Sequence, residues 1–477
     1  MNKKNKKKTL VLLFLLFILE LIIFSPHVGK GFITDDFIWL NSVVPDGNVD
    51  YIRPFTKATG FFRPMVGLSF AIQFQIHGMD PMPYGFFNLF LHILNIILVY
   101  LLLSIHKEFK PYAIWVAVLF ALNAKGTNMA VGWISGRTTL LFSFFILLSL
   151  YLYLRLPSKH GLRFILTAIC YFAALLSKET AIVAPLFVFF FSYIISDEYS
   201  KANHFFKRIK KSLNSIVVFF PPLIVYSLIR FNTDAIIPFN APSYYIYSFS
   251  PVLLLKNLSE YVIRAGLLDI YIILLTIVLV FFIVKKPGPR VAINLLAIYI
   301  GLLWFLIFLL PLLPIPSRSD LYSYFPQIGL HAITSAIIFP MFKNFEIKNT
   351  LKRYIIYTLI CLTTLGWIGY QISKAASIGE KGESSTEFTE QVVLTAFKIP
   401  PRSRIFIIDT HFDKGVSPSR LVSYGFNSLL KMYYPQKNLS GKIISPTESI
   451  EVKNKTGINY FFIWENKELR HVAIDTI

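Results

Sequence analysis

The sequence predicts a polytopic α-helical membrane protein with about eleven transmembrane helices and a small C-terminal α/β domain. Of 477 residues, 55% are hydrophobic and only 15% are charged. The mean hydropathy is positive, at +0.58, and soluble globular domains do not show this combination. Several apolar runs of about 20 residues are each long enough to cross a hydrocarbon core of roughly 30 Å. Basic residues are also distributed unequally between the connections that separate these runs.

The first apolar segment, residues 9–24, follows a lysine-rich start. A signal peptide is one interpretation, but no small-x-small cleavage site precedes Ser25 and Pro26, so an uncleaved anchor is preferred. Apolar periodicity and length place the further spans along the first 372 residues. They are expected at residues 84–105, 110–122, 138–154, 164–176, 180–195, 212–229, 267–284, 291–313, 324–341 and 354–372.

The placement of charge orients these spans, because lysine and arginine near span ends are retained in the cytoplasm. The N-terminus and the connections expected on the same side hold 22 Lys and Arg, whereas the opposite loops hold 11. The N-terminus is therefore expected in the cytoplasm of a cell (plasma or inner) membrane. The same asymmetry explains the net charge of +21 as a topology signal that also suits anionic lipid headgroups, so nucleic-acid binding is not expected.

The first outer loop, residues 31–83, follows the first span and contains Asp35 and Asp36 among aromatic and aliphatic residues. Aromatic residues favour a membrane interface, so this part of the loop is expected to lie on it. Residues 64–76 are apolar but too short to span with ease, and they predict an interfacial helix. Two adjacent carboxylates can supply a general base and a metal or acceptor ligand. The alternative is a solvated loop with a helix cap.

From residue 373 the composition changes, because charge rises and apolar runs shorten. Residues 373–477 are therefore expected to form an extracytoplasmic α/β domain, with residues 1–372 as the transmembrane domain. Buried strands are predicted at residues 404–409 and 459–464. Helices are predicted near residues 387–398 and 424–433.

Several basic residues lie near span ends on the proposed outer side. A group of fixed cations at headgroup depth suits a phosphate. Taken singly, each cation is better explained as a side chain that reaches to the interface. Lys178 is followed by Glu179, which predicts an ion-pair-capable couple at the outer surface. The proposed phosphate-binding cations are Arg63, Arg137, Lys178 and Arg318.

Several short motifs follow one another in a fixed order along the chain. They are Asp35-Asp36, Phe62-Arg63-Pro64-Met65, Gly78-Met79-Asp80-Pro81, Trp133-Ile134-Ser135-Gly136-Arg137, Ser177-Lys178-Glu179 and Arg318-Ser319-Asp320-Leu321-Tyr322. This order resembles that of membrane glycosyltransferases of the C-type (GT-C) fold. The nearest groups are the protein O-mannosyltransferases and the O-mannosyltransferases whose eukaryotic members carry tetratricopeptide repeats. The resemblance covers roughly residues 10–335 and does not extend to the tail.

The resemblance implies an enzyme that moves a sugar from a polyprenyl-phosphate donor to an acceptor hydroxyl outside the membrane, with inversion. The acceptor would be a glycan, a lipid or a protein. Asp35 would be the catalytic base, and Asp36 would bind the acceptor or a metal. The cations and Glu179 would bind the donor phosphate or line the pocket. The acid pair is compatible with a divalent cation (Mg²⁺ or Mn²⁺), and the resemblance implies no other cofactor.

Three other functions are compatible with parts of the sequence. A transporter also has many spans, but transporters place ionisable groups at mid-membrane, often in two related halves. Here the central parts of the spans are nearly free of charge, and no two halves match. Glu20 is the exception, but it lies near the outer end of the first span. A ligase or polymerase of lipid-linked glycans would share the arginines without needing Asp35 and Asp36. A non-catalytic scaffold or sensor is the remaining alternative.

Overall fold

The computed structural model describes most of the 477 residues. The ranges that it does not describe are residues 1–2, 46, 57–60, 158–160, 196–203, 234–245, 284–293, 344–349, 412–416, 453–457, 466 and 473–477. Parts of the first outer loop and the ends of two predicted spans, 267–284 and 291–313, fall in these ranges.

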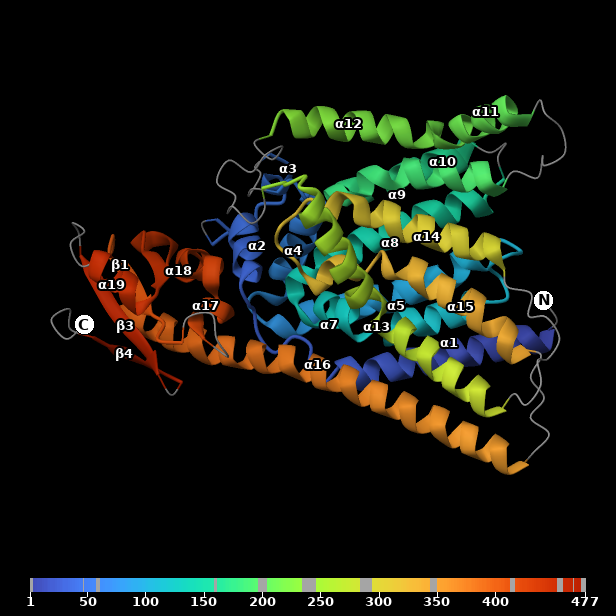
Figure 1. Cartoon of the computed structure of the whole chain (residues 1–477). Coiled ribbons are helices and arrows are strands. Elements are labelled where there is room, and N and C mark those ends of the chain that lie inside the picture. Colours follow the sequence, from blue (N-terminus) through green and yellow to red (C-terminus); the bar gives the residue numbers. More distant parts are fainter. Residues whose placement is uncertain are drawn as a thin grey trace.

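The described part of the first 343 residues is almost entirely helical. The longer helices lie side by side in a bundle (Figure 1). They are α1 (Lys3–Phe24), α5 (Pro81–Leu103), α6 (Ala113–Leu122), α7 (Ala124–Gly132), α8 (Arg137–Arg155), α9 (Gly161–Leu175), α10 (Ala184–Ile195), α11 (His204–Ile216), α12 (Phe220–Phe231), α13 (Pro251–Ile283), α14 (Leu295–Leu309) and α15 (Gln327–Lys343). Short 3-10 segments join some of them, namely η1 (Ile134–Gly136), η2 (Glu179–Val183), η3 (Val217–Phe219), η5 (Leu310–Leu312) and η6 (Asp320–Ser323).

Local sequence signals explain where several of these helices begin. At the start of α5, the Asp80 carboxylate accepts a hydrogen bond from the Met82 N–H at 3.0 Å, and Pro81 occupies the first turn. At the start of α14, the Asn294 side chain accepts from the Ala297 N–H at 3.1 Å. Such caps satisfy amide groups that have no partner within the helix. Proline suits the first turn because its ring fixes a helical φ.

A helix occupies every range in which a span is expected. Five helical stretches of the described residues are long and apolar enough to cross a membrane, or six if α6 and α7, bent by 64°, count as one. They are Pro81–Leu103, Ile134–Arg155, Phe205–Phe231, Leu295–Leu312 and Arg353–Lys398. The protein is thus a multi-pass helical membrane protein, while the expected number of eleven spans stays a prediction.

The last long helix, α16 (Thr350–Lys398), has 49 residues. At 1.5 Å per residue it is about 74 Å long, more than twice the thickness of a hydrocarbon core. It runs along one side of the bundle and ends at the C-terminal sheet (Figure 1). The domain boundary expected at residue 373 therefore lies inside one continuous helix, because the polar residues that follow it are compatible with helix.

The C-terminal sheet has four strands in the order β2-β1-β3-β4. Strand β1 (Arg404–Ile408) pairs in parallel with β2 (Ser440–Ile444) and β3 (Asn459–Glu465), while β4 (Glu468–His471) is antiparallel to β3. The predicted strands at 404–409 and 459–464 are confirmed as β1 and β3. The accompanying helices are α17 (Pro418–Leu421), η7 (Ser423–Gly425), α18 (Phe426–Tyr433), η8 (Pro435–Lys437) and α19 (Pro446–Val452).

Alternate residues of β1 face two different cores. Ile405 and Ile407 join the main core, which also includes Phe388 of α16 and Phe426 of α18. Phe406 packs in a smaller core on the opposite face of the sheet. This period of two is what a strand buried on both faces requires. One continuous core thereby connects the helical bundle with the sheet.

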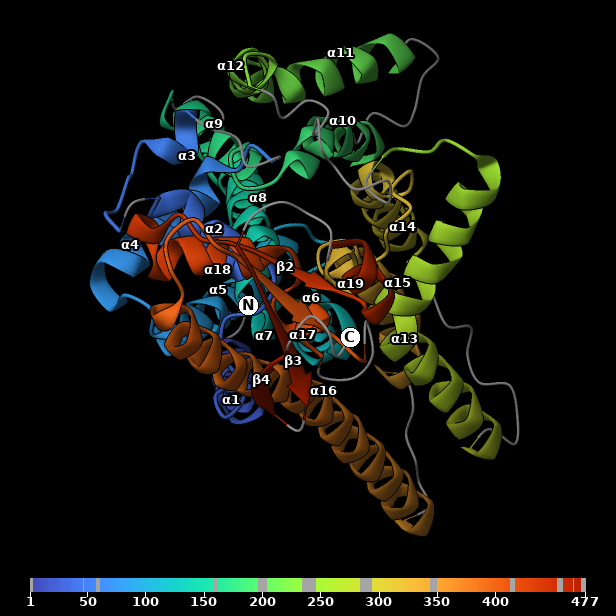
Figure 2. The same cartoon turned by 90° about the vertical axis from the view of Figure 1, so that its left-hand side faces the viewer.

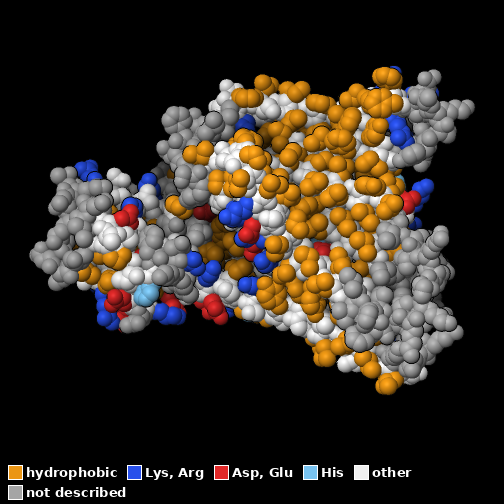
Figure 3. All heavy atoms as spheres, in the orientation of Figure 1, with side chains coloured by type: hydrophobic (Ala, Val, Ile, Leu, Met, Phe, Trp, Pro, Cys, Tyr) orange, Lys and Arg blue, Asp and Glu red, His pale blue; other side chains and the backbone are white. Residues whose placement is uncertain are grey.

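The first outer loop forms α2 (Asp35–Val43), α3 (Arg53–Thr56) and α4 (Pro64–His77). Helix α2 lies between the bundle and the sheet in Figure 1, and Figure 2, seen from the sheet side, shows α3 and α4 to the left of the sheet. Apolar side chains cover much of the bundle surface, and most of the visible charges lie at its two ends and around the sheet (Figure 3). The acid pair therefore lies near one end of the apolar surface, next to the C-terminal sheet.

Candidate active site

Asp36 is fully buried in the first turn of α2, and both of its carboxylate oxygens accept hydrogen bonds. One oxygen accepts from the Ile33 N–H at 2.8 Å, and the other accepts from the N–H of Ser135, also at 2.8 Å, and from the Ser135 hydroxyl. Burial raises the pKa of Asp36 to about 7, although these hydrogen bonds oppose the shift. Asp36 thus ties the first outer loop to the segment before α8.

This arrangement does not suit Asp36 as a metal ligand, because its carboxylate is fully buried and each oxygen already accepts a hydrogen bond. Within the described ranges no group of three or more His, Cys, Asp or Glu side chains is arranged to hold a metal ion. A divalent cation at Asp36 therefore does not fit the side chains that surround it. Because the Asp36 side chain is fully buried, it also presents no exposed surface to an acceptor.

Asp35 differs from its neighbour, since its side chain is only half-buried. Among the residues that the structure describes, its carboxylate has no hydrogen-bond or ion-pair partner. Burial raises the pKa of Asp35, and the positive charge of Arg63 partly offsets that effect. A carboxylate that is partly accessible, has no partner among the described residues and is more basic than usual is suited to accept a proton.

Arg63, at the start of α4, forms a two-pronged ion pair with Glu179. The Arg63 Nε and Nη2 atoms donate to the two carboxylate oxygens at 2.9 and 2.6 Å, and the side chains are 13% and 24% exposed. A backbone hydrogen bond of 3.1 Å from the Met65 N–H to the Leu176 carbonyl holds the two loops together nearby. The guanidinium geometry matches a carboxylate or a phosphate in the same way.

Lys178 is 4% exposed and lies beside the same pair. Its Nζ donates to the Thr139 hydroxyl at 2.9 Å and stands 5.2 Å from the centre of the Tyr322 ring. Burial and then the charge of Arg63 lower its pKa to about 7, and Glu179 only partly opposes them. The ammonium group therefore lacks a carboxylate of its own and would gain from an anionic ligand.

The structure places Arg137 apart from this group. Its side chain is fully buried, donates to the Asn88 side-chain oxygen at 3.1 Å and the Tyr84 carbonyl at 3.0 Å, and stacks on Phe70 and Phe87. Asn88 in turn donates to the carbonyls of Trp133 and Ile134, both at 3.0 Å. Arg137 thus braces α4, α5 and α8, with its donors directed at protein atoms.

Arg318 also has a protein partner. Its Nε donates to the Asn257 side-chain oxygen at 2.6 Å, and the Asn257 amide donates to the carbonyls of Leu313 and Ile315 at 2.7 and 2.8 Å. No described contact joins Arg318 to Arg63 or Lys178. Of the proposed site residues, the structure therefore brings Asp35, Arg63, Lys178 and Glu179 together.

Two buried pairs of ionisable side chains lie inside the bundle, and the sequence did not predict their pairing. The Glu20 carboxylate lies 3.4 Å from His92 Nε2, and His92 Nδ1 lies 2.7 Å from the Tyr324 hydroxyl. Asp269 lies 2.8 Å from His331 Nδ1. The partners in each pair are more than 60 positions apart along the chain, so only the fold brings them together. The occurrence of these polar residues within apolar runs indicates buried polar contacts, although it does not identify the partners.

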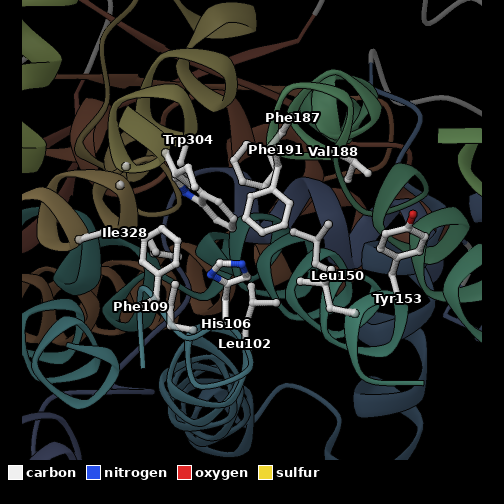
Figure 4. A pocket seen from close by; sticks show the side chains of 16 residues that line it. Leu102, His106, Phe109, Leu150, Tyr153, Phe187, Val188, Phe191, Trp304 and Ile328 are labelled. Carbon is white, nitrogen blue, oxygen red and sulfur yellow. The ribbon is translucent and has the colours of Figure 1, made fainter. Parts of the chain in front are cut away.

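Apolar cavities occur in the bundle as well. One of about 50 Å³ is lined by side chains of α5, α8, α10, α14 and α15. Figure 4 shows the rings of Phe187, Phe191 and Trp304 around it, with His106 nearby. A second, of about 470 Å³, is lined by α6, α13, α15 and α16. Most of the side chains that line the two cavities are apolar, so both cavities suit hydrocarbon chains. None of the proposed site residues lines either cavity.

Comparison with known proteins supports the resemblance seen in the motifs. No protein-family model matches the chain. Over 184 residues, 35% of this chain, it is 28% identical to protein O-mannosyl-transferase Tmtc1 of Drosophila melanogaster. The expected resemblance to the O-mannosyltransferases is confirmed. The match spans only 21% of that relative's length.

Three solved structures match part or most of the chain. The first is ArnT from Cupriavidus metallidurans bound to undecaprenyl phosphate, at 11% identity and a TM-score of 0.47, covering 98% of this chain and 94% of that one. The second is the Archaeoglobus fulgidus oligosaccharyltransferase tethered with an acceptor peptide, at 12% identity and 0.49, covering 93% and 64%. The third is the S. cerevisiae protein O-mannosyltransferase Pmt1-Pmt2 complex bound to the sugar donor, at 18% and 0.35, covering 47% and 34%. Likenesses at this level carry no information about substrate or mechanism.

Proposed function

We propose that this protein is a membrane glycosyltransferase of the GT-C type. It moves a sugar from a polyprenyl-phosphate donor to a hydroxyl of a glycan, lipid or protein acceptor, on the extracytoplasmic side of a cell membrane. Asp35 is the general base, and the group formed by Arg63, Lys178 and Glu179 binds the donor phosphate. The curated relative is an O-mannosyltransferase by name, which favours a hexosyl donor.

The chemistry follows from the groups present. Asp35 removes the proton of the acceptor hydroxyl as its oxygen attacks the anomeric carbon of the donor sugar. The bond from that carbon to the phosphate oxygen breaks, and the electron pair leaves with the phosphate. Attack on the face opposite the leaving phosphate inverts the anomeric configuration. Arg63 and Lys178 stabilise the negative charge that develops on the phosphate.

The observation that carries this proposal is the contrast between the two neighbouring carboxylates. Asp36 is buried and fully hydrogen-bonded, whereas Asp35 is half-buried with no partner among the described residues. Arg63 is close enough to affect the pKa of Asp35 and also that of Lys178. The Asp35 carboxylate therefore lies near Arg63, which in turn lies near Lys178. A base and cations close together at one end of the apolar surface suit glycosyl transfer from a lipid phosphate.

The test uses purified protein in bilayer vesicles with a panel of radiolabelled polyprenyl-phosphate sugars. The proposal predicts transfer or slow hydrolysis of one donor class, and inversion of the anomeric configuration in the product as read by NMR. Asp35→Asn should abolish turnover while donor binding persists. Absence of turnover with every donor, or a product that retains configuration, contradicts the proposal.

Transport is the second candidate, because Glu20 with His92 and Asp269 with His331 place titratable pairs inside the bundle. Transporters use such groups to carry protons or ions. Vesicles that contain the protein and a pH-sensitive dye would then show donor-independent proton flux. Loss of this flux in His92→Gln would favour transport, and flux equal to that of empty vesicles would exclude this candidate.

A further inference from the structure

Thr34, which directly precedes Asp35, has an unusual backbone conformation. Its φ is 48° and its ψ is −111°. A β-branched residue rarely adopts a positive φ, because its side chain crowds the backbone. Such conformations persist only where the surroundings enforce them, and they occur often at functional sites. The contacts of Thr34 therefore decide where Asp35 points.

Those contacts come from the C-terminal region. The Thr34 N–H donates to the Leu421 carbonyl of α17 at 2.8 Å. Gly425 of η7 packs so closely that a Cβ there would lie 2.1 Å from the Thr34 carbonyl oxygen and 3.2 Å from the Cβ of Phe37. Leu421 and Phe37 are both buried. Residue 425 must therefore be glycine for the Thr34 backbone to occupy its position.

Helix α16 fixes the residues just before Thr34. The Ser385 hydroxyl donates to the Phe32 carbonyl at 2.6 Å, and the Thr386 hydroxyl donates to the Lys30 carbonyl at 3.1 Å. On the other side, Asp36 is tied to Ser135 of the bundle. Asp35 thus sits between a backbone held by the C-terminal region and a neighbour held by the bundle, while its own carboxylate is left without a partner.

We propose that the α17–η7 segment, Pro418–Gly425, positions Asp35 for catalysis through the backbone of Thr34, with Gly425 and the Leu421 carbonyl as positioning residues. The inference rests on the proposed function, since it assigns the C-terminal region a part in the same reaction. The α17–η7 segment would orient Asp35 in the same way whichever acceptor the enzyme uses. Both residues are proposed to act through Thr34 and not through contact with the substrate.

The test compares Gly425→Ala with Gly441→Ala. The methyl group at 425 must displace the Thr34 backbone, and a base moved by about 1 Å can cost on the order of a hundredfold in rate. A Cβ at residue 441 of β2 would instead meet side-chain ends of Phe426 and Leu430, at 2.5 and 2.6 Å, and would perturb the same domain without meeting Thr34. We expect kcat to fall about ten- to a hundredfold in Gly425→Ala only, with donor KM unchanged.

Hydrogen–deuterium exchange supplies a readout that needs no activity. Amides of residues 33–37 should exchange faster in Gly425→Ala and at the wild-type rate in Gly441→Ala. Equal losses of kcat in the two variants would overturn the inference, as would faster exchange without a fall in kcat, or unchanged exchange. Full turnover by Asp35→Asn would instead contradict the proposed function. The exchange measurement would still report whether residue 425 fixes the backbone around Thr34.

A second variant covers the case in which Gly425→Ala fails to fold. Thr34→Gly adopts the same φ without strain and removes a side chain that forms no capping hydrogen bond. It should keep the wild-type thermal midpoint while loosening the residue before Asp35. We expect a several-fold fall in kcat with unchanged donor KM, and a wild-type kcat would overturn the inference.

Discussion

Replacing Lys178 with methionine should stabilise the folded protein most strongly at acidic and neutral pH. The buried ammonium has a folded-state pKa of about 7, whereas the ordinary value is 10.5. At about 1.4 kcal/mol per pKa unit, that difference costs the wild type at most about 5 kcal/mol of unfolding free energy. Methionine has a similar length and carries no charge, so it removes this cost.

The sign of the pH dependence follows from proton binding. Below pH 7 the wild-type lysine is protonated in the folded and the unfolded protein, and the whole cost applies. As the pH rises from about 7 to 10.5, the folded protein loses its proton first and the cost disappears. The stabilisation by Lys178→Met should therefore be largest at pH 6 and approach zero near pH 10.

Thermal unfolding in detergent, followed by tryptophan fluorescence from pH 6 to pH 10, measures this difference. Lys256→Met serves as the control, because Lys256 is exposed and in a helix of the same protein. It should change the midpoint little at any pH. Donor binding by Lys178→Met should weaken even though its midpoint rises. A lower midpoint at pH 6, or a difference that does not vary with pH, would refute the assignment of Lys178 as a buried cation that lacks its own counter-charge.

Three further substitutions probe the surrounding residues. Asp36→Asn should lower the unfolding free energy by about 1–3 kcal/mol through lost acceptor capacity. Because burial raises the pKa of Asp36 to about 7, the wild type should lose stability as the pH rises from 3.8 to about 7. The variant should lack this pH dependence, as thermal midpoints over this range will show. Arg63→Lys keeps the positive charge but loses the two parallel N–H donors of the guanidinium group. Donor titration should therefore give roughly five- to thirtyfold weaker binding. Unchanged affinity would contradict phosphate binding by Arg63. Asn88→Ala leaves buried Arg137 without one acceptor and should lower the unfolding free energy by about 2–4 kcal/mol in denaturation experiments, whereas the lipid-facing substitution Ile97→Ala should cost much less.

The sequence predicted which side chains could act but not all of their partners. Asp35, Arg63, Lys178 and Glu179 were expected at one surface from span order and charge, and the structure brings them together. Arg137 was expected among them for the same reason. Its actual partners, Asn88 and the Tyr84 carbonyl, depend on how α5 and α8 pack, and charge placement carries no information on packing.

The differences in the fold have a similar cause. Apolar runs predicted where helices would lie, and the strands of the sheet followed from their own periodicity. The continuity of α16 through residue 373 was not predicted, because a change in composition marks a change in solvent and not the end of a helix. The contact of Gly425 with Thr34 joins residues nearly 400 positions apart, and no local pattern encodes such a pairing.

Single-turnover transfer with donor already bound tests the central claim most directly. Wild type is compared with Asp35→Asn and with Asp50→Asn, whose parent carboxylate in the same loop accepts from the N–H groups of Ile52 and Arg53. General-base catalysis predicts a rate about 10²- to 10⁴-fold lower in Asp35→Asn, unchanged donor affinity, and a near wild-type rate in Asp50→Asn. Transfer by Asp35→Asn within twofold of wild type would show that Asp35 is not the base.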